Sequence, residues 1–264
     1  NSIAGMAGVQ PGEAGEVQWT VIAYRGLTKA QATKINKVSL TRFFGFSELP
    51  SALYLRGDAV ENGSIMCGAP ANGEYEVFVK LEGGKTFTMN SAADGSGTAY
   101  CLDDDKIKEG TYAYTVEKTG IYRISMDFNV ASLTFFKEIK DLGMYLCEMD
   151  AVPDANFLKY EGNGVWANNI QLDRIVTSWG TDERYRFRMT YADDTQIWWG
   201  AIASCDGKPN GAAAGDAYYK LYEYPITAPG DDQWSLKWKW DSQFDYKLAR
   251  VSVTFNVPVY THFI

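Results

Sequence analysis

The feature of this chain that most limits its fold is an internal repeat. Four short segments occur twice, in the same order along the chain. The matched pairs are residues 53–60 with 144–152, 73–81 with 164–172, 87–89 with 187–189, and 127–130 with 254–257. Each match alone is weak, but four in register indicate two copies of one structural unit. The boundary is predicted within residues 138–142, and the second copy carries an insertion between Met189 and Tyr246.

Both copies consist of short runs in which apolar and polar residues alternate, as in EYEVFVKL at residues 74–81. This period is that of a β-strand, and turn signals such as Asn62-Gly63 and Asn72-Gly73 separate the runs. No long helical period is present. The sequence therefore predicts an all-β fold of two tandem immunoglobulin-like β-sandwich modules.

The predicted organisation has three parts. Residues 1–16, rich in Gly and Ala, are expected to form a flexible leader, residues 17–139 a first β-sandwich module, and residues 140–264 a second module with the Trp-rich insertion. Residues 17–48 have no counterpart between the repeats. We expect them to add strands at 18–24 and 37–43 to the first sandwich, with a loop at 28–35. A truncated extra domain is the alternative.

Charge and cysteine content exclude several classes of protein. A net charge of −8 argues against a nucleic-acid partner, which requires a basic face. No apolar run of about 18 residues is present, so no membrane span is predicted. The four cysteines, Cys67, Cys101, Cys147 and Cys205, lack CxxC spacing, which argues against a zinc site. Free thiols and two disulfides both remain open, with free thiols slightly favoured.

The chain is rich in aromatic residues, with 8 Trp and 17 Tyr. Both side chains combine a flat apolar face with a polar group, and this suits a sugar ring, which is apolar on its C–H side and polar at its rim. The alternative is that the aromatic residues only fill a β-rich core, since they favour strands. Their distribution along the chain therefore matters more than their number.

Four of the eight tryptophans lie within residues 198–238, inside the insertion. Neighbouring strand residues face opposite sides, so one of Trp198 and Trp199 must point away from the core. Trp199 continues an apolar face, and Trp198 is therefore the residue predicted to be exposed. A strand predicted at residues 233–241 would place Trp234, Trp238 and Trp240 on one face. That face either belongs to the core or forms an exposed stacking platform.

A tyrosine-rich run follows the same logic. Tyr218 opens a face of tyrosines, and Lys220 lies beside it in sequence as a charged partner for sugar hydroxyls. Packing in the core is at least as good an explanation of these tyrosines. The predicted ligand-binding residues are Trp198, Trp234, Trp238, Trp240, Tyr218 and Lys220.

Signals for catalysis and for metals are weak. The carboxylates occur in no recognisable catalytic pair. The single histidine, His262, is expected at the surface end of a strand, without a triad motif around it. Residues 103–105 (DDD) are better explained as a solvated turn than as a calcium loop. We predict no catalytic residue, no metal and no cofactor.

A family resemblance adds to this interpretation. Residues 53–59 (LYLRGDA) resemble the "LYLVGDAT" opening of modules in SusE/SusF-type proteins, outer-membrane surface glycan-binding lipoproteins of Bacteroidetes. The strand starts at residues 73–75 (GEY) and 164–166 (GVW) are also similar to that repeat. The likeness covers residues 50–264 in outline. The tryptophan that usually follows the motif is missing in residues 59–65 (AVENGSI), which directs attention to the second module for a ligand site.

The resemblance implies no enzymatic activity, a lipid anchor at a processed N-terminus, and a TonB-dependent glycan importer as partner. The function expected from the sequence is therefore non-catalytic binding of a polysaccharide or oligosaccharide at the bacterial cell surface. The main alternative is a protein–protein interaction or adhesion module. An enzyme is a third possibility, which would require a groove with two inward carboxylates.

Overall fold

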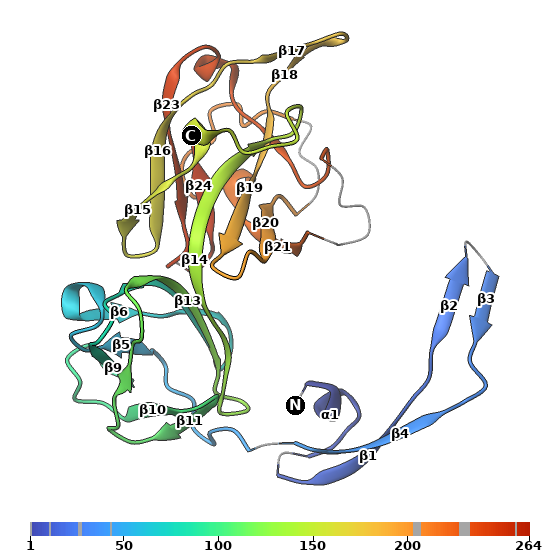
Figure 1. Ribbon diagram of the computed structural model, residues 1–264, viewed down its shortest axis with the longest axis vertical. Coiled ribbons are helices and arrows are strands. Elements are labelled where there is room, and N and C mark those ends of the chain that lie inside the picture. The colour runs from blue at the N-terminus through green and yellow to red at the C-terminus, as the bar shows by residue number, and fades with distance from the viewer. Residues whose placement is uncertain are drawn as a thin grey trace.

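The computed structural model describes residues 2–10, 12–25, 28–42, 44–202, 207–226, 233–256 and 258–264. Strands dominate these residues, and the single α-helix among them, α1, spans Ser2–Met6. The prediction of an all-β fold is confirmed. Figure 1 shows two β bodies joined by one long strand, and an N-terminal ribbon that extends away from both.

The first half of the structure (residues 44–139) encloses its own hydrophobic core. Its strands are β5 (Tyr54–Arg56), β6 (Ser64–Met66), β7 (Gly68–Ala71), β8 (Glu74–Leu81), β9 (Thr86–Asn90), β10 (Ala99–Asp103), β11 (Lys106–Glu109), β12 (Tyr114–Thr115) and β13 (Gly120–Asp127). Alternation places Val77 of β8 and Ile124 of β13 in this core, where Leu55 and Met89 also lie. The opposite face of β8 and β13 therefore points toward the rest of the molecule.

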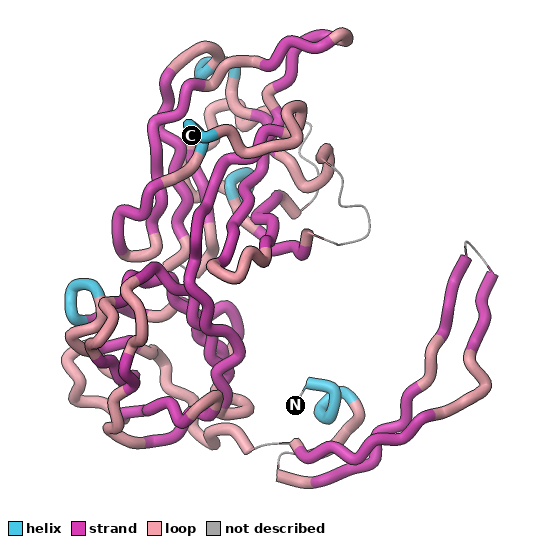
Figure 2. The backbone as a smooth tube through the Cα atoms, in the orientation of Figure 1, coloured by secondary structure: helices cyan, strands magenta, loops and turns pink. Residues whose placement is uncertain are grey.

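One strand, β14 (Ser132–Leu146), belongs to both halves (Figure 2). It pairs with β13 up to Ile139, and from Ile139 onward it pairs with β19 (Arg184–Tyr191). A register shift lies between Ile139 and Asp141. The predicted boundary at residues 139/140 falls at this irregularity, inside a continuous strand.

The second half (residues 140–264) is a sandwich of two sheets. Its remaining strands are β15 (Lys159–Gly162), β16 (Val165–Gln171), β17 (Ile175–Thr177), β18 (Gly180–Asp182), β20 (Gln196–Gly200), β21 (Tyr222–Pro225), β22 (Trp238–Lys239), β23 (Leu248–Thr254) and β24 (Thr261–Phe263). A sheet of β15, β16, β23 and β24 faces a sheet of β14, β19, β20 and β21. Trp166 and Val253 from the first sheet share one core with Phe187 and Trp199 from the second.

Within the residues that the structure describes, four short 3-10 helices interrupt the connections between strands. They are η1 (Glu61–Gly63), η2 (Asp154–Asn156), η3 (Ala217–Tyr219) and η4 (Ser242–Phe244). Asp216 caps the N-terminus of η3, and Asp241 caps that of η4. The side chain of each accepts a hydrogen bond from a backbone N–H in the turn that follows.

The repeated segments of the sequence form matching strand pairs. β8 pairs with β13, and β16 pairs with β23. Residues that correspond in the repeat are paired in both cases, as Glu74 with Asp127 and Val165 with Thr254. Gly73 and Gly164, which precede β8 and β16, both have positive φ, of 78° and 72°. A Cβ on either glycine would approach the amide of Asn129 or Asn256 to 2.5 Å. The two copies therefore require glycine at the same turn for the same reason.

The N-terminal residues do not extend the first half. β1 (Ala14–Trp19) pairs with β4 (Asn36–Thr41), and β2 (Ile22–Arg25) pairs with β3 (Thr28–Gln31), each as a two-stranded sheet of its own. The expectation that these strands add to the first sandwich is wrong, and so is the loop expected at residues 28–35, because hairpin pairing makes β3. The leader expected at residues 1–16 contains α1 and the start of β1, and a small cluster of Ala4, Val9 and Val17 joins helix to ribbon.

The two halves are joined by a buried contact. Phe78 of β8 enters the core of the second half and stacks on Phe255, with ring centroids 4.2 Å apart. The amide of Asn256 accepts from the backbone N–H of Phe78 at 3.0 Å and donates to its carbonyl at 2.9 Å. Nearby, Glu61 accepts from the hydroxyl of Tyr160. These contacts fix β8 against the second half.

Candidate functional site

The tandem tryptophans of β20 face opposite sides, as the alternation predicts. Trp199 lies in the main core of the second half, and Trp198 lies in a smaller cluster on the other face of the sheet. The prediction that Trp198 is exposed is wrong, because only 6% of it reaches solvent. The guanidinium of Arg186 covers its ring at 3.7 Å, and Tyr145 packs against it at 4.8 Å.

Trp238 and Trp240 are not exposed either, with 0% and 1% accessibility. Residues 233–236 form turns, Leu236 has a φ of 56°, and the strand predicted at 233–241 is reduced to β22. The indole N–H of Trp238 donates to the carbonyl of Tyr218 at 2.7 Å, and that of Trp240 donates to Asp245 at 2.9 Å. Both tryptophans are therefore core residues whose indole N–H groups are hydrogen-bonded, and they form no stacking platform in this structure.

Tyr218 and Lys220 lie at the edge of the same core. Tyr218 is in η3 instead of a strand, and its hydroxyl donates to the carbonyl of Lys239 at 2.7 Å. The backbone of Lys220 forms an isolated β-bridge with Thr261. The six predicted residues therefore do not meet in one place: Trp238, Trp240 and Tyr218 pack on the core side, whereas Trp198 and Trp234 belong to the cluster on the opposite face.

Trp234 is the predicted tryptophan that keeps partial exposure, and it is part of a surface stack. The guanidinium carbon of Arg184 lies 4.1 Å from the centroid of Trp234 and 5.3 Å from that of Trp179. Trp179 is 60% exposed. We call Trp179, Arg184 and Trp234 the Trp179 cluster. The carboxylate of Asp182 accepts from the guanidinium and holds it in place.

The sequence prediction missed Trp179, although a signal for it exists. Trp179 lies in the turn between β17 and β18, where the hydroxyl of Thr177 donates to the carbonyl of Gly180 at 2.9 Å. A residue at the tip of a two-stranded hairpin has no sheet above it to bury its side chain. A Trp beside a Gly in a short turn (residues 177–180, TSWG) is therefore a better predictor of exposure than a Trp-rich strand.

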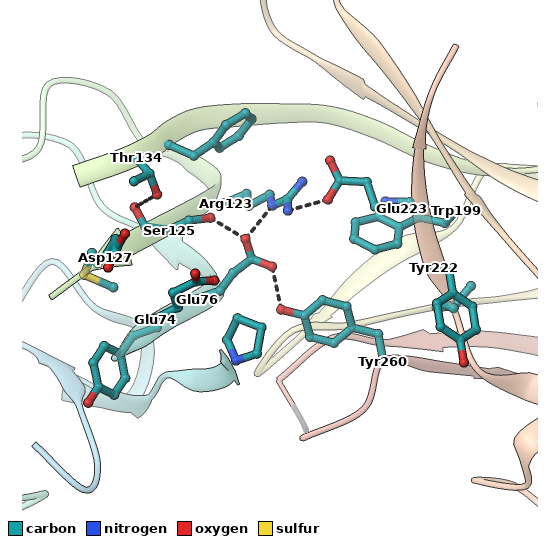
Figure 3. Close-up of a pocket in the computed structure, with 15 residues that line it drawn as sticks. Glu74, Glu76, Arg123, Ser125, Asp127, Thr134, Trp199, Tyr222, Glu223 and Tyr260 are labelled. Carbon is teal, nitrogen blue, oxygen red and sulfur yellow. Dashed lines mark hydrogen bonds and ion pairs between the residues drawn. The ribbon is translucent and has the colours of Figure 1, made fainter. Parts of the chain in front are cut away.

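A second candidate is a groove of about 600 Å³ where the two halves meet, which we call the junction groove. Its lining comes from β8, β13 and β14 on one side, and from β20, β21 and Tyr260 on the other. Figure 3 shows Glu74 and Asp127 toward one end of it and Glu223 toward the other. Polar contacts run between these ends.

Glu76 is at the centre of these contacts and is only 6% exposed. Its carboxylate accepts from Nε of Arg123 at 2.8 Å, from the hydroxyl of Tyr260 at 2.5 Å, and from the hydroxyl of Ser125. Burial raises the pKa of Tyr260, and the charge of Glu76 raises it further, so this hydroxyl keeps its proton. Three donors converge on Glu76, an acceptor geometry and not that of a general acid.

Arg123 connects the two halves from the same position. Its guanidinium donates to the hydroxyl of Tyr191 at 3.1 Å and to Glu223 at 2.6 Å. It also lies 5.0 Å from the ring centroid of Phe135 and 5.4 Å from that of Trp199. Burial lowers the pKa of Arg123, but the hydrogen bond to Glu223 and the charge of Glu76 outweigh burial and raise it overall. The guanidinium is therefore permanently charged and fully engaged.

His262 is not a surface residue, which corrects the expectation from sequence. It is 2% exposed, and its Nδ1 lies 3.0 Å from the carbonyl of Tyr219. Because a carbonyl only accepts, Nδ1 carries the proton, and Nε2 accepts from the hydroxyl of Tyr185 at 2.8 Å. Burial lowers the pKa of His262 to about 3, so the ring is neutral and structural.

In the described part of the chain, the cysteines supply no reactive thiol and the acidic side chains supply no metal site. Cys67, Cys101 and Cys147 are buried free thiols, while Cys205 lies outside the described residues. Burial raises the pKa of Cys67 and of Cys147 to about 12, which makes both thiols unreactive. The described part of the chain contains no group of three or more His, Cys, Asp or Glu side chains arranged for a metal ion. None of its helices is long and apolar enough to cross a membrane.

The fold and its sheets define an all-β sandwich protein. Among solved structures, the chain is similar to the crystal structure of SusF from Bacteroides thetaiotaomicron, with 12% sequence identity and a TM-score of 0.41. The similarity covers 87% of this chain and 52% of that chain, so this chain spans about half the length of the SusF structure. No family model and no curated protein matches the sequence.

Proposed function

We propose that this protein binds glycans without catalysis, and that the Trp179 cluster is the surface that contacts the sugar. The observation that carries the proposal is an indole ring that is 60% exposed at a hairpin tip and backed by the guanidinium of Arg184. An exposed aromatic face is costly in water unless a ligand covers it. The C–H face of a sugar ring is a suitable cover.

The cluster also offers polar groups beside its rings, which sugar hydroxyls require. Arg184 lies between Trp179 and Trp234, so its N–H groups lie next to both aromatic faces. Asp182 is 2% exposed and fixes the guanidinium from below. Because Asp182 already holds the guanidinium, little freedom of the Arg184 side chain is lost when a ligand binds.

Titration calorimetry against a panel of polysaccharides tests this proposal. We expect micromolar to millimolar affinity for at least one glycan, and a loss of about tenfold in Trp179→Ala, because one aromatic contact contributes about 1.5 kcal/mol. Trp19→Ala is the matched control, since Trp19 is 51% exposed in the N-terminal ribbon. The proposal fails if no glycan binds, or if the two variants behave alike.

The cellular context is a further part of the proposal and is supported by the resemblance of residues 53–59. It comprises the outer-membrane surface, a lipid anchor upstream of the globular part, and a TonB-dependent importer as partner. Protease digestion of intact Bacteroidetes cells that produce the full-length protein tests the location. Resistance to digestion until the cells are broken would contradict it.

The N-terminal ribbon favours a second candidate function, that of an adhesion or protein-interaction module. Trp19, Val21, Tyr24 and Val38 are all exposed on this ribbon. Each of its two-stranded sheets also has unpaired edges, which can accept a strand of a partner. If adhesion is the function, removal of residues 1–42 abolishes partner binding, whereas Trp179→Ala leaves it unchanged.

A further inference from the structure

Two carboxylates face each other at one end of the junction groove. Glu74 of β8 and Asp127 of β13 are directly opposite in the antiparallel ladder, so their side chains share a face. Like charges in this position destabilise a sheet. The Glu74 side chain makes no hydrogen bond or ion pair with any described residue, and the Asp127 carboxylate accepts only from Asn129, at 2.9 and 3.0 Å through one oxygen. No cation among the described residues compensates the pair.

The groove as a whole has an excess of acceptors. Its single cation, Arg123, uses all three nitrogens on Glu76, Tyr191 and Glu223, as described above. The side chain of Glu223 is 40% exposed, and its second oxygen has no partner in the described part of the chain. The carboxylates of the lining are Glu74, Glu76, Asp127 and Glu223. A ligand that fits this lining must donate hydrogen bonds and carry positive charge.

Aromatic side chains form another part of the lining. Phe135 and Tyr222 are partly exposed in the groove, next to the carboxylates. Aromatic faces attract organic cations, and carboxylates add a direct ion pair. A bare metal ion would leave the aromatic faces unused, whereas an ammonium group on a carbon skeleton uses both kinds of surface.

We infer that the junction groove binds a ligand that carries more than one protonated primary amine, with one ammonium between Glu74 and Asp127 and another at Glu223. Glu74 and Asp127 lie toward one end of the groove and Glu223 toward the other, and the ligand's carbon skeleton spans the lining between them, where Figure 3 places Tyr260. The volume of about 600 Å³ is within the range of small-molecule sites, roughly 300–1,000 Å³. An oligosaccharide of amino sugars and a linear polyamine both have this chemistry.

Calorimetry with three ligands tests the inference and separates the two sources. The ligands are the trisaccharide of glucosamine, the same trisaccharide fully N-acetylated, and spermidine. We expect binding of at least one of the two amines, and no binding of the N-acetylated sugar, which has lost its positive charges. Binding of the glucosamine trisaccharide would identify an amino sugar as the ligand. Binding of spermidine without the trisaccharide would identify a polyamine. Equal binding of the N-acetylated sugar, or no binding of either amine, overturns the inference.

Isosteric variants locate the site. Glu74→Gln and Asp127→Asn should each weaken amine binding about tenfold, while Glu109→Gln, an exposed residue on β11 outside the groove, should change nothing. Glu74 has no structural partner, so its variant keeps the fold, which a thermal unfolding curve verifies. An unchanged affinity in Glu74→Gln excludes the groove. Trp179→Ala should leave amine binding intact, so failure here and failure of the glycan proposal are distinguishable.

Discussion

The strand pairs β8–β13 and β16–β23 have the same register within the repeat but very different surroundings. Arg123 and Arg250 occupy equivalent positions in them, opposite Phe78 and Asn169. The side chain of Arg123 is 10% exposed, whereas that of Arg250 is 56% exposed and pairs with Glu161 at the surface. The difference arises because the second half packs over β8 and β13. The same strand pairing therefore contains a buried ion network around Arg123 and an exposed ion pair at Arg250.

Replacing the two arginines should give the largest contrast. Arg123→Ala leaves Glu76 buried without its ion-pair partner, and loss of one partner of a buried pair costs about 3–5 kcal/mol of unfolding free energy. Arg250→Ala removes an exposed pair, so its urea unfolding curve should overlap that of the wild type. If both variants lose the same stability, the junction network is not what distinguishes the two strand pairs.

The two repeat asparagines provide the next contrast. Asn256 bonds both backbone groups of the buried Phe78, whereas Asn129 donates to the carbonyl of Asn72 and to Asp127 near the surface. Asn256→Ala leaves the buried N–H and C=O of Phe78 without their partners, and it should lower the unfolding free energy by about 2–3 kcal/mol. Asn129→Ala should cost about 1 kcal/mol or less, because water replaces its bonds. If urea unfolding gives equal losses of stability for both variants, the hydrogen bonds from Asn256 to Phe78 add no stability.

Acid should destabilise the second half through His262, since the first half contains no histidine. The folded pKa of about 3 lies below the ordinary value of 6.5, so the unfolded chain binds the proton first as pH falls. The stability contribution is complete above pH 6.5 and is lost toward pH 3, about 2 kcal/mol of it between pH 7 and pH 5. Unfolding curves at both pH values measure it. His262→Gln should remove this pH dependence, and a variant that keeps the full slope would contradict the assignment.

The sequence was sufficient for those features that depend on local periodicity. Alternation predicted the all-β fold, and it placed Trp199 in the core and Trp198 on the other face. The repeat also matched Gly73 with Gly164, and both glycines have positive φ at the same turn. Each of these follows from a period of two or from a short turn, and both are visible in neighbouring residues.

The exposure of each tryptophan and the position of the binding surfaces depend on contacts between residues far apart in the chain. The periodicity of the sequence carries no information about such contacts. Trp198 is buried because Arg186, on the neighbouring strand, lies across its ring. The junction groove exists because β21 and Tyr260 come to lie beside β8, more than 140 residues earlier in the chain. Glu74 and Asp127 show the limit most directly, since only the strand register reveals that they are opposite each other.

The smallest expected effect concerns this acidic pair. In the second half, the equivalent positions are Val165 and Thr254, which carry no charge. Glu74→Gln removes one of two like charges, so at low salt and without ligand it should raise the unfolding free energy by about 0.2–1 kcal/mol. The gain should vanish at 1 M salt, where charges are screened within about 3 Å. Glu109→Gln is the control, and it should show no comparable gain.

A stabilising Glu74→Gln would mean that the wild-type groove is electrostatically strained when empty. Such strain is relieved by a cationic ligand, which is the property that separates this strand pair from its uncharged counterpart in the second half. A loss of stability at both salt concentrations would instead give Glu74 a structural role, and the acidic end of the groove would then need no ligand to explain it.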